Sequence, residues 1–267
     1  MILLVYLAAT EDVTYIQGNI PLILTVPHGG KEKADIRPRQ GNVNNKSDSE
    51  TQSIGETVQK HFKKLTGRTP HLIMSNLHRS VMDPNRDIEE AAQGNKRAVA
   101  AYQDFHNTIK KVKKAFGGKP GLLIDIHGQA HMKNRTEIGY LIKAEDLNSG
   151  NYRKGNLSIK SLVSRNKETA KLKDFICGNR SLGALFDETE YQAVPSPQKP
   201  SPGKDKYFNG GYITSTYGSW DGGLVDAIQL EIQSEVRTGG GWPLRENFSK
   251  ELAHILATFF SRNYDYE

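Results

Sequence analysis

Two histidines in this chain stand at the exits of apolar runs, where each could reach a shared metal ion. His28 follows Pro21–Val26, and His127 follows Gly121–Ile126. Two imidazoles and a carboxylate form the ligand set of a catalytic zinc site, which keeps one position open for water. A further carboxylate can serve as general base beside such an ion. The residue types and their places predict a metal centre assembled from segments far apart in the sequence.

The two histidines can converge whatever their separation in sequence. Ligands of open α/β sheets bind at the carboxyl ends of the strands, and His28 and His127 each stand beside a glycine at such an end. Asp125 lies two residues before His127, so both side chains point to the same side of the strand. Asp125 is therefore placed to steer the imidazole or to hold a substrate donor. The alternatives are hydrogen-bonded loop histidines and a buried acid paired with a base.

Glu231 is the candidate general base. It lies within the apolar run Val225–Ile232, and a buried glutamate has a raised pKa unless it is paired. Such a group can take a proton from water and return it to a leaving amine. The alternative is a buried salt bridge with an arginine such as Arg237.

Candidate anion contacts lie in the run from His78 to Asp87. Arg86 has Asn85 on one side and Asp87 on the other, and an arginine held by neighbouring acids makes a rigid fork suited to a carboxylate. Arg79 is a second candidate. The alternative is a structural salt bridge at a helix N-terminus.

His131 and Asp48 have two interpretations each. His131 lies four residues after His127, but Gly128 breaks any helix between them, so we expect a hydrogen-bond donor to substrate or a simple loop residue rather than a ligand. Asp48 precedes the helical pattern Glu50–Leu65, where an N-cap is expected. Spacing alone leaves it as either a cap or a metal ligand.

The elements that must position these residues alternate between strands and helices. We expect strands at Val13–Ile16, Pro21–Val26, Pro70–Met74, Gly121–Ile126, Glu137–Ile142 and Val225–Ile232. We expect helices at Glu50–Leu65, Ile88–Phe116, Ser158–Val163, Ser181–Phe186 and Asn247–Arg262. This order predicts an α/β protein, a three-layer α/β/α sandwich around one mixed, mostly parallel sheet. Residues 1–267 are expected to form a single domain with surface excursions at 147–173 and 195–206.

Composition narrows the class of partner. Of the 267 residues 36% are apolar, and the net charge is +6. The lysines are not interleaved with aromatic residues as in a platform for single strands, so we expect a solvated basic surface and no nucleic-acid partner. No apolar run is long enough to span a bilayer, so no membrane partner is expected. The single cysteine, Cys177, excludes an internal disulfide and a cysteine-based zinc site.

The N-terminus and the sequons favour secretion, with a cytoplasmic protein as the alternative. Residues 1–12 begin with a short apolar run that ends in small residues, which fits either a signal remnant or a first strand. Five Asn-X-Ser/Thr sequons would make a secreted form a glycoprotein; they begin at Asn45, Asn134, Asn156, Asn179 and Asn247.

In combination these segments resemble the N-formylglutamate amidohydrolase family, which is related in fold to the zinc carboxypeptidases. The motifs occur in the order Pro-His-Gly, Asp-X-X-Thr, Asp-X-Asn-Arg, Asp-X-His-Gly, Gly-Gly-Tyr-Ile-Thr and Gln-Leu-Glu. The similarity runs from about Val13 to the end of the chain. By this resemblance, His28, Asp48 and His127 would hold one Zn²⁺ ion, and Glu231 would match the general base and acid.

The resemblance also implies a substrate pocket. Asn85 and Arg86 would match the pair that binds a substrate carboxylate, and Gly211 and Tyr212 would line the pocket. The bacterial deformylases tend to carry arginine shortly after Gly-Gly-Tyr-Ile-Thr, where this chain has Ser215. The chemistry can therefore be kept while formylglutamate itself is lost as substrate.

The function implied is a zinc-dependent hydrolase that cleaves the C–N amide bond of a small N-formyl-like N-acyl amino acid or related carboxylate-bearing molecule. His131 or Arg79 would stabilise the oxyanion. The expected partner is thus a small anionic substrate, and no oligomeric state follows. Three alternatives stay open: a peptidase, peptidoglycan amidase or ester hydrolase on the same site, a recruited non-hydrolytic reaction, and a non-catalytic secreted binding protein.

Overall fold

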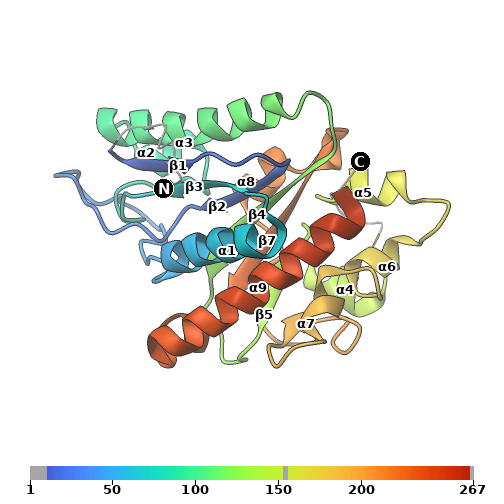
Figure 1. Ribbon diagram of the computed structural model, residues 1–267. Coiled ribbons are helices and arrows are strands. Elements are labelled where there is room, and N and C mark those ends of the chain that lie inside the picture. Colours follow the sequence, from blue (N-terminus) through green and yellow to red (C-terminus); the bar gives the residue numbers. More distant parts are fainter. Residues whose placement is uncertain (1–10, 153–155, 265–267) are drawn as a thin grey trace.

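The structure, a computed structural model, describes residues 11–152 and 156–264, and within them a seven-stranded sheet forms the centre (Figure 1). The strands are β1 (Val13–Ile16), β2 (Leu22–Val26), β3 (His71–Ser75), β4 (Gly121–Gly128), β5 (Thr136–Gly139), β6 (Ala193–Val194) and β7 (Val225–Ile232). Their order across the sheet is β1-β3-β2-β4-β7-β5-β6. β1–β3 and β5–β7 are antiparallel and the other pairs are parallel.

Helices cover both faces of this sheet, so the predicted α/β sandwich is confirmed (Figure 1). One face carries α1 (Thr51–Thr66) and α9 (Gly241–Tyr264), which pack against each other, and the other carries α3 (Lys96–Ala115) and α8 (Tyr212–Tyr217). The remaining helices are α2 (Ile88–Ala92), α4 (Ala144–Ser149), α5 (Lys160–Arg165), α6 (Leu172–Ile176), α7 (Leu182–Phe186), η1 (Ser219–Asp221) and η2 (Glu235–Gly239). None of the described helices combines the length and the apolar character needed to cross a bilayer.

Side chains along β4 and β7 alternate between the two faces of the sheet, and this alternation decides which face carries the polar residues of the site. Leu122, Ile124 and Ile126 of β4 belong to the core on the α1/α9 side, whereas Leu123 packs with α3 and α8. Because successive strand residues point to opposite faces, Asp125 and His127 share the side of Leu123.

The same argument applies to β7, which pairs with β4 in parallel register. Ile228 and Leu230 face the α1/α9 core and Ala227 faces α3 and α8. Gln229 and Glu231 therefore lie on the α3/α8 side, and their register partners are Asp125 and His127. The parallel pairing therefore brings the polar side chains of both strands to the same edge of the sheet.

The predicted helix over Ile88–Phe116 is wrong, because the structure has two helices there. Gln93 and Gly94 have φ of 46° and 73°, a left-handed conformation that ends α2. The Asn95 side chain then accepts a hydrogen bond from the backbone of Ala98 and begins α3. The strand expected to reach Ile142 ends at Gly139, and Leu141 shortly after has φ of 66°.

The excursion expected at 147–173 falls within the stretch of α4, α5 and α6, whose apolar residues extend the α1/α9 core. The terminal helix begins at Gly241 instead of Asn247, with Pro243 in its first turn, where proline is tolerated. Most of the segment read as a signal remnant or first strand, residues 1–10, lies outside the described residues.

Candidate metal centre and substrate pocket

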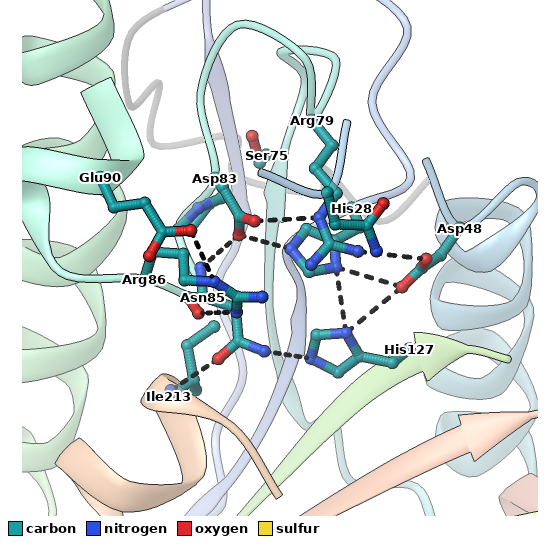
Figure 2. Close-up of polar contacts among 12 residues, drawn as sticks. His28, Asp48, Ser75, Arg79, Asp83, Asn85, Arg86, Glu90, His127 and Ile213 are labelled. Carbon is teal, nitrogen blue, oxygen red and sulfur yellow. Dashed lines mark hydrogen bonds and ion pairs between the residues drawn. The ribbon is translucent and has the colours of Figure 1, made fainter. Parts of the chain in front are cut away.

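Three side chains from separate segments form a triangle of donor atoms at the carboxyl edge of the sheet (Figure 2). His28 Nδ1 lies 3.1 Å from Asp48 Oδ2 and 3.1 Å from His127 Nδ1, and His127 Nδ1 lies 3.3 Å from Asp48 Oδ2. Ligands about 2.0–2.1 Å from a tetrahedral ion are about 3.3–3.4 Å apart. The spacing and the chemistry of these donors fit one face of a tetrahedral metal site.

Asp83 sets the orientation of the His28 ring. His28 Nε2 lies 2.6 Å from Asp83 Oδ1, and since an ionised carboxylate can only accept, this nitrogen carries the proton and Nδ1 is free for a metal. Asp83 also accepts from Arg79 Nε at 2.9 Å and from Arg39 Nη2 at 3.3 Å. Burial alone would raise the pKa of Asp83, but His28, Arg79 and Arg86 outweigh it and hold that pKa well below its usual value.

Asp125 does the same for His127. His127 Nε2 lies 2.8 Å from Asp125 Oδ2, and Thr25 donates to Asp125 Oδ1 at 2.7 Å. Asp125 is fully buried behind the ring, and it is not among the residues that line the cavity in front of the site. The position fits its expected steering role, whereas the structure offers no direct route from Asp125 to a substrate.

Asp48 is fixed by the backbone around it and does not cap α1. Its backbone N–H donates to the carbonyl of His28 at 3.0 Å, and its Oδ2 accepts from the backbone N–H of Gly128 at 3.1 Å. The N-cap of α1 is Glu50, which makes no side-chain cap bond. The cap interpretation of Asp48 is therefore wrong.

Arg237 holds together the segments that carry Asp48, His127 and Glu231. Its guanidinium donates to the carbonyls of Ser49, Gln129 and Ile232 at 2.9, 2.9 and 3.0 Å. A Cβ at residue 128 would lie 2.3 Å from the Arg237 Nε atom, which explains the glycine of His127-Gly128. No salt bridge joins Arg237 to Glu231 among the described residues, so this alternative for Glu231 is not realised.

Glu231 lies beside His127 in the parallel register and lines the cavity. Burial raises the pKa of Glu231 to about 8, against the lowering effect of His127. Gln229 donates its side-chain N–H to Glu231 Oε1 at 2.9 Å. A carboxyl group with such a pKa can both take and return a proton near neutral pH.

The cavity in front of the donor triangle has a volume of about 420 Å³ and is rich in cationic groups. Lys46, Arg79, Arg86 and Arg237 all contribute to its walls. Arg86 is held by Glu90, 3.0 Å from its Nε, while about a third of its side chain stays exposed (Figure 2). The cavity therefore suits a small anion.

Asn85 and Gly211 form part of the cavity wall beside His127. The backbone N–H of Ile213 donates to Asn85 Oδ1 at 2.9 Å, so the Asn85 amide group turns its Nδ2 atom towards His127, 3.4 Å from the ring (Figure 2). A Cβ on Gly211 would lie 2.4 Å from that Nδ2 atom. Tyr212, expected in the pocket, turns instead against His106, with ring centroids 5.8 Å apart.

His131 stands at the cavity wall and is held on two sides. Its Nδ1 atom lies 2.8 Å from Glu137 Oε1, and its ring stacks on Phe208 at 4.6 Å between centroids. Glu137 is fully buried and also accepts from the backbone of Phe208. The structure thus brings His131 to the cavity, apart from the three donor atoms.

Several residues of the site were not expected from the sequence. They are Arg39, Asp83 as the partner of His28, Glu137, Gln229, and Arg237 as the residue that joins the segments of Ser49, Gln129 and Ile232. Gln229 and Glu137 carry a signal that would have found them. Gln229 lies between the apolar residues Ile228 and Leu230, and Glu137 is the one charged residue of the predicted strand Glu137–Ile142. Arg39 carries no local signal, since its partners Arg79, Asp83 and Glu90 lie 40, 44 and 51 residues away.

Comparison with known proteins gives the fold. No protein-family model matches this chain, and no curated protein matches its sequence. The chain is similar to a crystal structure of N-formylglutamate amidohydrolase from Ralstonia eutropha JMP134, with TM-score 0.58 and 14% identity over 95% of this chain and 99% of that one. It is also similar to gene product Atu2144 from Agrobacterium tumefaciens, with TM-score 0.54 and 11% identity over 94% of each chain. The resemblance inferred from the motifs is confirmed at the level of the fold.

Proposed function

We propose that this chain is a zinc-dependent hydrolase that cleaves the C–N amide bond of a small, carboxylate-bearing N-acyl amino acid. The observation that carries the proposal is the triangle of His28 Nδ1, Asp48 Oδ2 and His127 Nδ1, with each imidazole oriented by a buried carboxylate. The fold shared with an N-formylglutamate amidohydrolase supports the choice of reaction.

His28, Asp48 and His127 would hold the ion. Two nitrogens and one carboxylate oxygen are a donor set that zinc accepts while one position stays open. A zinc ion in such a site supplies Lewis acidity, which activates water and polarises a carbonyl oxygen.

The chain's own residues would then divide the remaining work. Glu231 takes a proton from the attacking water and delivers it to the leaving nitrogen, so that the amide and one water give a carboxylate and an amine. Arg79 is a donor at the cavity wall that can stabilise negative charge developing on the carbonyl oxygen. His131, whose Nδ1 proton faces Glu137, would do so through Nε2 as an imidazolium.

Arg86 and Asn85 would orient the substrate. The Arg86 guanidinium, held by Glu90, offers its fork to the substrate carboxylate, while Asn85 offers a fixed N–H donor beside it. Holding the amide in one position converts an encounter into an effectively unimolecular reaction.

Elemental analysis followed by a substrate panel tests the proposal. The purified protein should contain close to one zinc per chain, and a panel of N-formyl, N-acetyl and N-succinyl amino acids should yield at least one free amine that disappears with a chelator and returns with Zn²⁺. Peptides and peptidoglycan fragments belong in the same panel because they share the amide bond. A metal-loaded protein that releases no amine from any member contradicts the proposal.

A further inference from the structure

Gln229 stands at the cavity wall with one of its two polar atoms unused. It lies in β7 two residues before Glu231, so both side chains point to the same side of the sheet. The residue is 3% exposed and lines the cavity. Its Oε1 atom is buried and accepts no hydrogen bond from any of the described residues.

The orientation of this amide follows from its neighbour. Gln229 Nε2 lies 2.9 Å from Glu231 Oε1. In the ionised state, the state in which Glu231 can take a proton from water, its carboxylate accepts hydrogen bonds but donates none. The N–H side of the Gln229 amide is thus committed to Glu231. The carbonyl side is left as a buried acceptor without a donor, a situation that destabilises a protein unless a ligand supplies one.

Other side-chain amides around the same cavity differ in this respect. The Asn44, Asn85 and Gln129 side-chain oxygens accept from the backbone N–H groups of Lys46, Ile213 and His131, respectively. Among the side-chain amides that line the described cavity, Gln229 alone has its oxygen without a protein donor. An N–H group of a bound molecule could donate the missing hydrogen bond to this oxygen.

We infer that Gln229 accepts the N–H of the substrate's scissile amide and so restricts the enzyme to secondary amides; this rests on the proposed hydrolase function. Arginine side chains and Asn85 supply donors for the oxygens of an N-acyl amino acid, whose one remaining polar hydrogen is the amide N–H. Gln229 would bind this hydrogen with its Oε1 atom while its Nε2 atom holds Glu231. One side chain would therefore both recognise the substrate amide and position the proton acceptor.

An ester of the same shape would fit this position poorly. It replaces N–H by an oxygen whose lone pairs would face Gln229 Oε1, leaving two acceptors opposite each other. Sites built to hydrogen-bond a substrate N–H or O–H reject analogues that lack it far more strongly than apolar pockets reject a missing methylene. The structure therefore assigns to Gln229 the discrimination of amides from esters.

The test compares N-acetyl-L-alanine with O-acetyl-L-lactate, or the same pair built on the side chain that the substrate panel selects. The quantity is kcat/KM divided by the uncatalysed rate constant, which corrects for the greater reactivity of esters. For the wild-type protein we expect this ratio to be at least about 10-fold larger for the amide. An equal or larger value for the ester overturns the inference, and this measurement needs no variant.

Gln229→Met removes the acceptor while keeping the side-chain length. We expect the amide-to-ester ratio of kcat/KM to fall about 10- to 100-fold, because loss of the contact to Glu231 affects both substrates whereas loss of the acceptor affects the amide only. Gln233→Met is the matched control, since Gln233 is equally buried, follows the same strand and is not part of the cavity wall. Its ratio should stay at the wild-type value.

The outcomes separate the two proposals. Equal losses for amide and ester in Gln229→Met leave the hydrolase intact and overturn the role of Gln229 as a reader of the N–H. A zinc-loaded wild-type protein that hydrolyses no member of the panel overturns the hydrolase, and the role of Gln229 with it.

Discussion

The Nε2 atom of His28 lies 2.6 Å from the Oδ1 atom of Asp83, and the opposite ring nitrogen faces Asp48 and His127. This bond selects which nitrogen can bind a metal. Asp83 is itself held by Arg79 and by the backbone N–H of Asn85, 2.9 Å from its carboxylate in each case. The ring that would bind the metal and the segment that would bind the substrate therefore share one anchor.

Asp83→Asn should weaken zinc binding about 10- to 100-fold, the usual effect of removing the carboxylate behind a ligating histidine. The neutral amide is a weaker acceptor for His28 Nε2, and its NH₂ group would face either His28 or Arg79. Competition with a fluorescent chelator measures the affinity. Asp205→Asn, which removes a surface partner of Arg135 at 3.1 Å, is the control. Unchanged affinity in Asp83→Asn would show that Asp83 serves the fold alone.

Replacing a ligand and replacing the base should have separable effects. His127→Ala should lose both zinc and activity, because it removes one corner of the donor triangle. Glu231→Gln should keep zinc and lose about 100- to 10,000-fold in kcat, the range associated with general acid–base catalysis. Metal content by mass spectrometry and kcat on the panel's best substrate are the two readouts. Full turnover by Glu231→Gln rejects the assignment of the base.

The parts of the site that lie on central strands could be predicted from the sequence. Apolar runs before His28 and His127 and around Glu231 mark buried parallel strands, and such strands deliver their carboxyl ends to one edge. The observed register pairs His127 with Glu231 directly. Period and composition therefore suffice to bring these residues together.

Loop residues could not be placed in the same way. Asp48 precedes a helix, as an N-cap does, and its path to the histidines depends on a backbone bond to His28 and on Arg237, which lies 188 residues from its partner Ser49. Neither contact has a periodic signal. The break between α2 and α3 at Gly94 cannot be predicted for a related reason. The apolar face of Ile88–Phe116 continues across it, so the pattern alone indicates one helix.

Arg86→Lys should raise KM at least about 10-fold with little change in kcat, because it removes a contact made equally in the ground state and the transition state. Lysine keeps the charge but loses the planar fork that Glu90 holds at 3.0 Å. The same kinetics with the substrate carboxylate converted to a primary amide provide the control, since wild-type and variant should then differ little. If Arg86→Lys raises KM as much for the neutral substrate, then Arg86 stabilises the conformation of its loop and does not bind the carboxylate.

In the metal-free protein, the stability contributed by Glu231 should decline as pH rises. The folded-state pKa of about 8 lies above the ordinary value of 4.5, so between these values the folded chain holds a proton that the unfolded chain has released. The free energy of unfolding falls with pH wherever the folded state binds more protons. Urea denaturation with a chelator present should therefore show the wild-type protein losing on the order of 3 kcal/mol relative to Glu231→Gln between pH 5 and pH 8. A difference between the two proteins that stays constant over this range would mean that Glu231 is ionised throughout, with a partner that stabilises its charge.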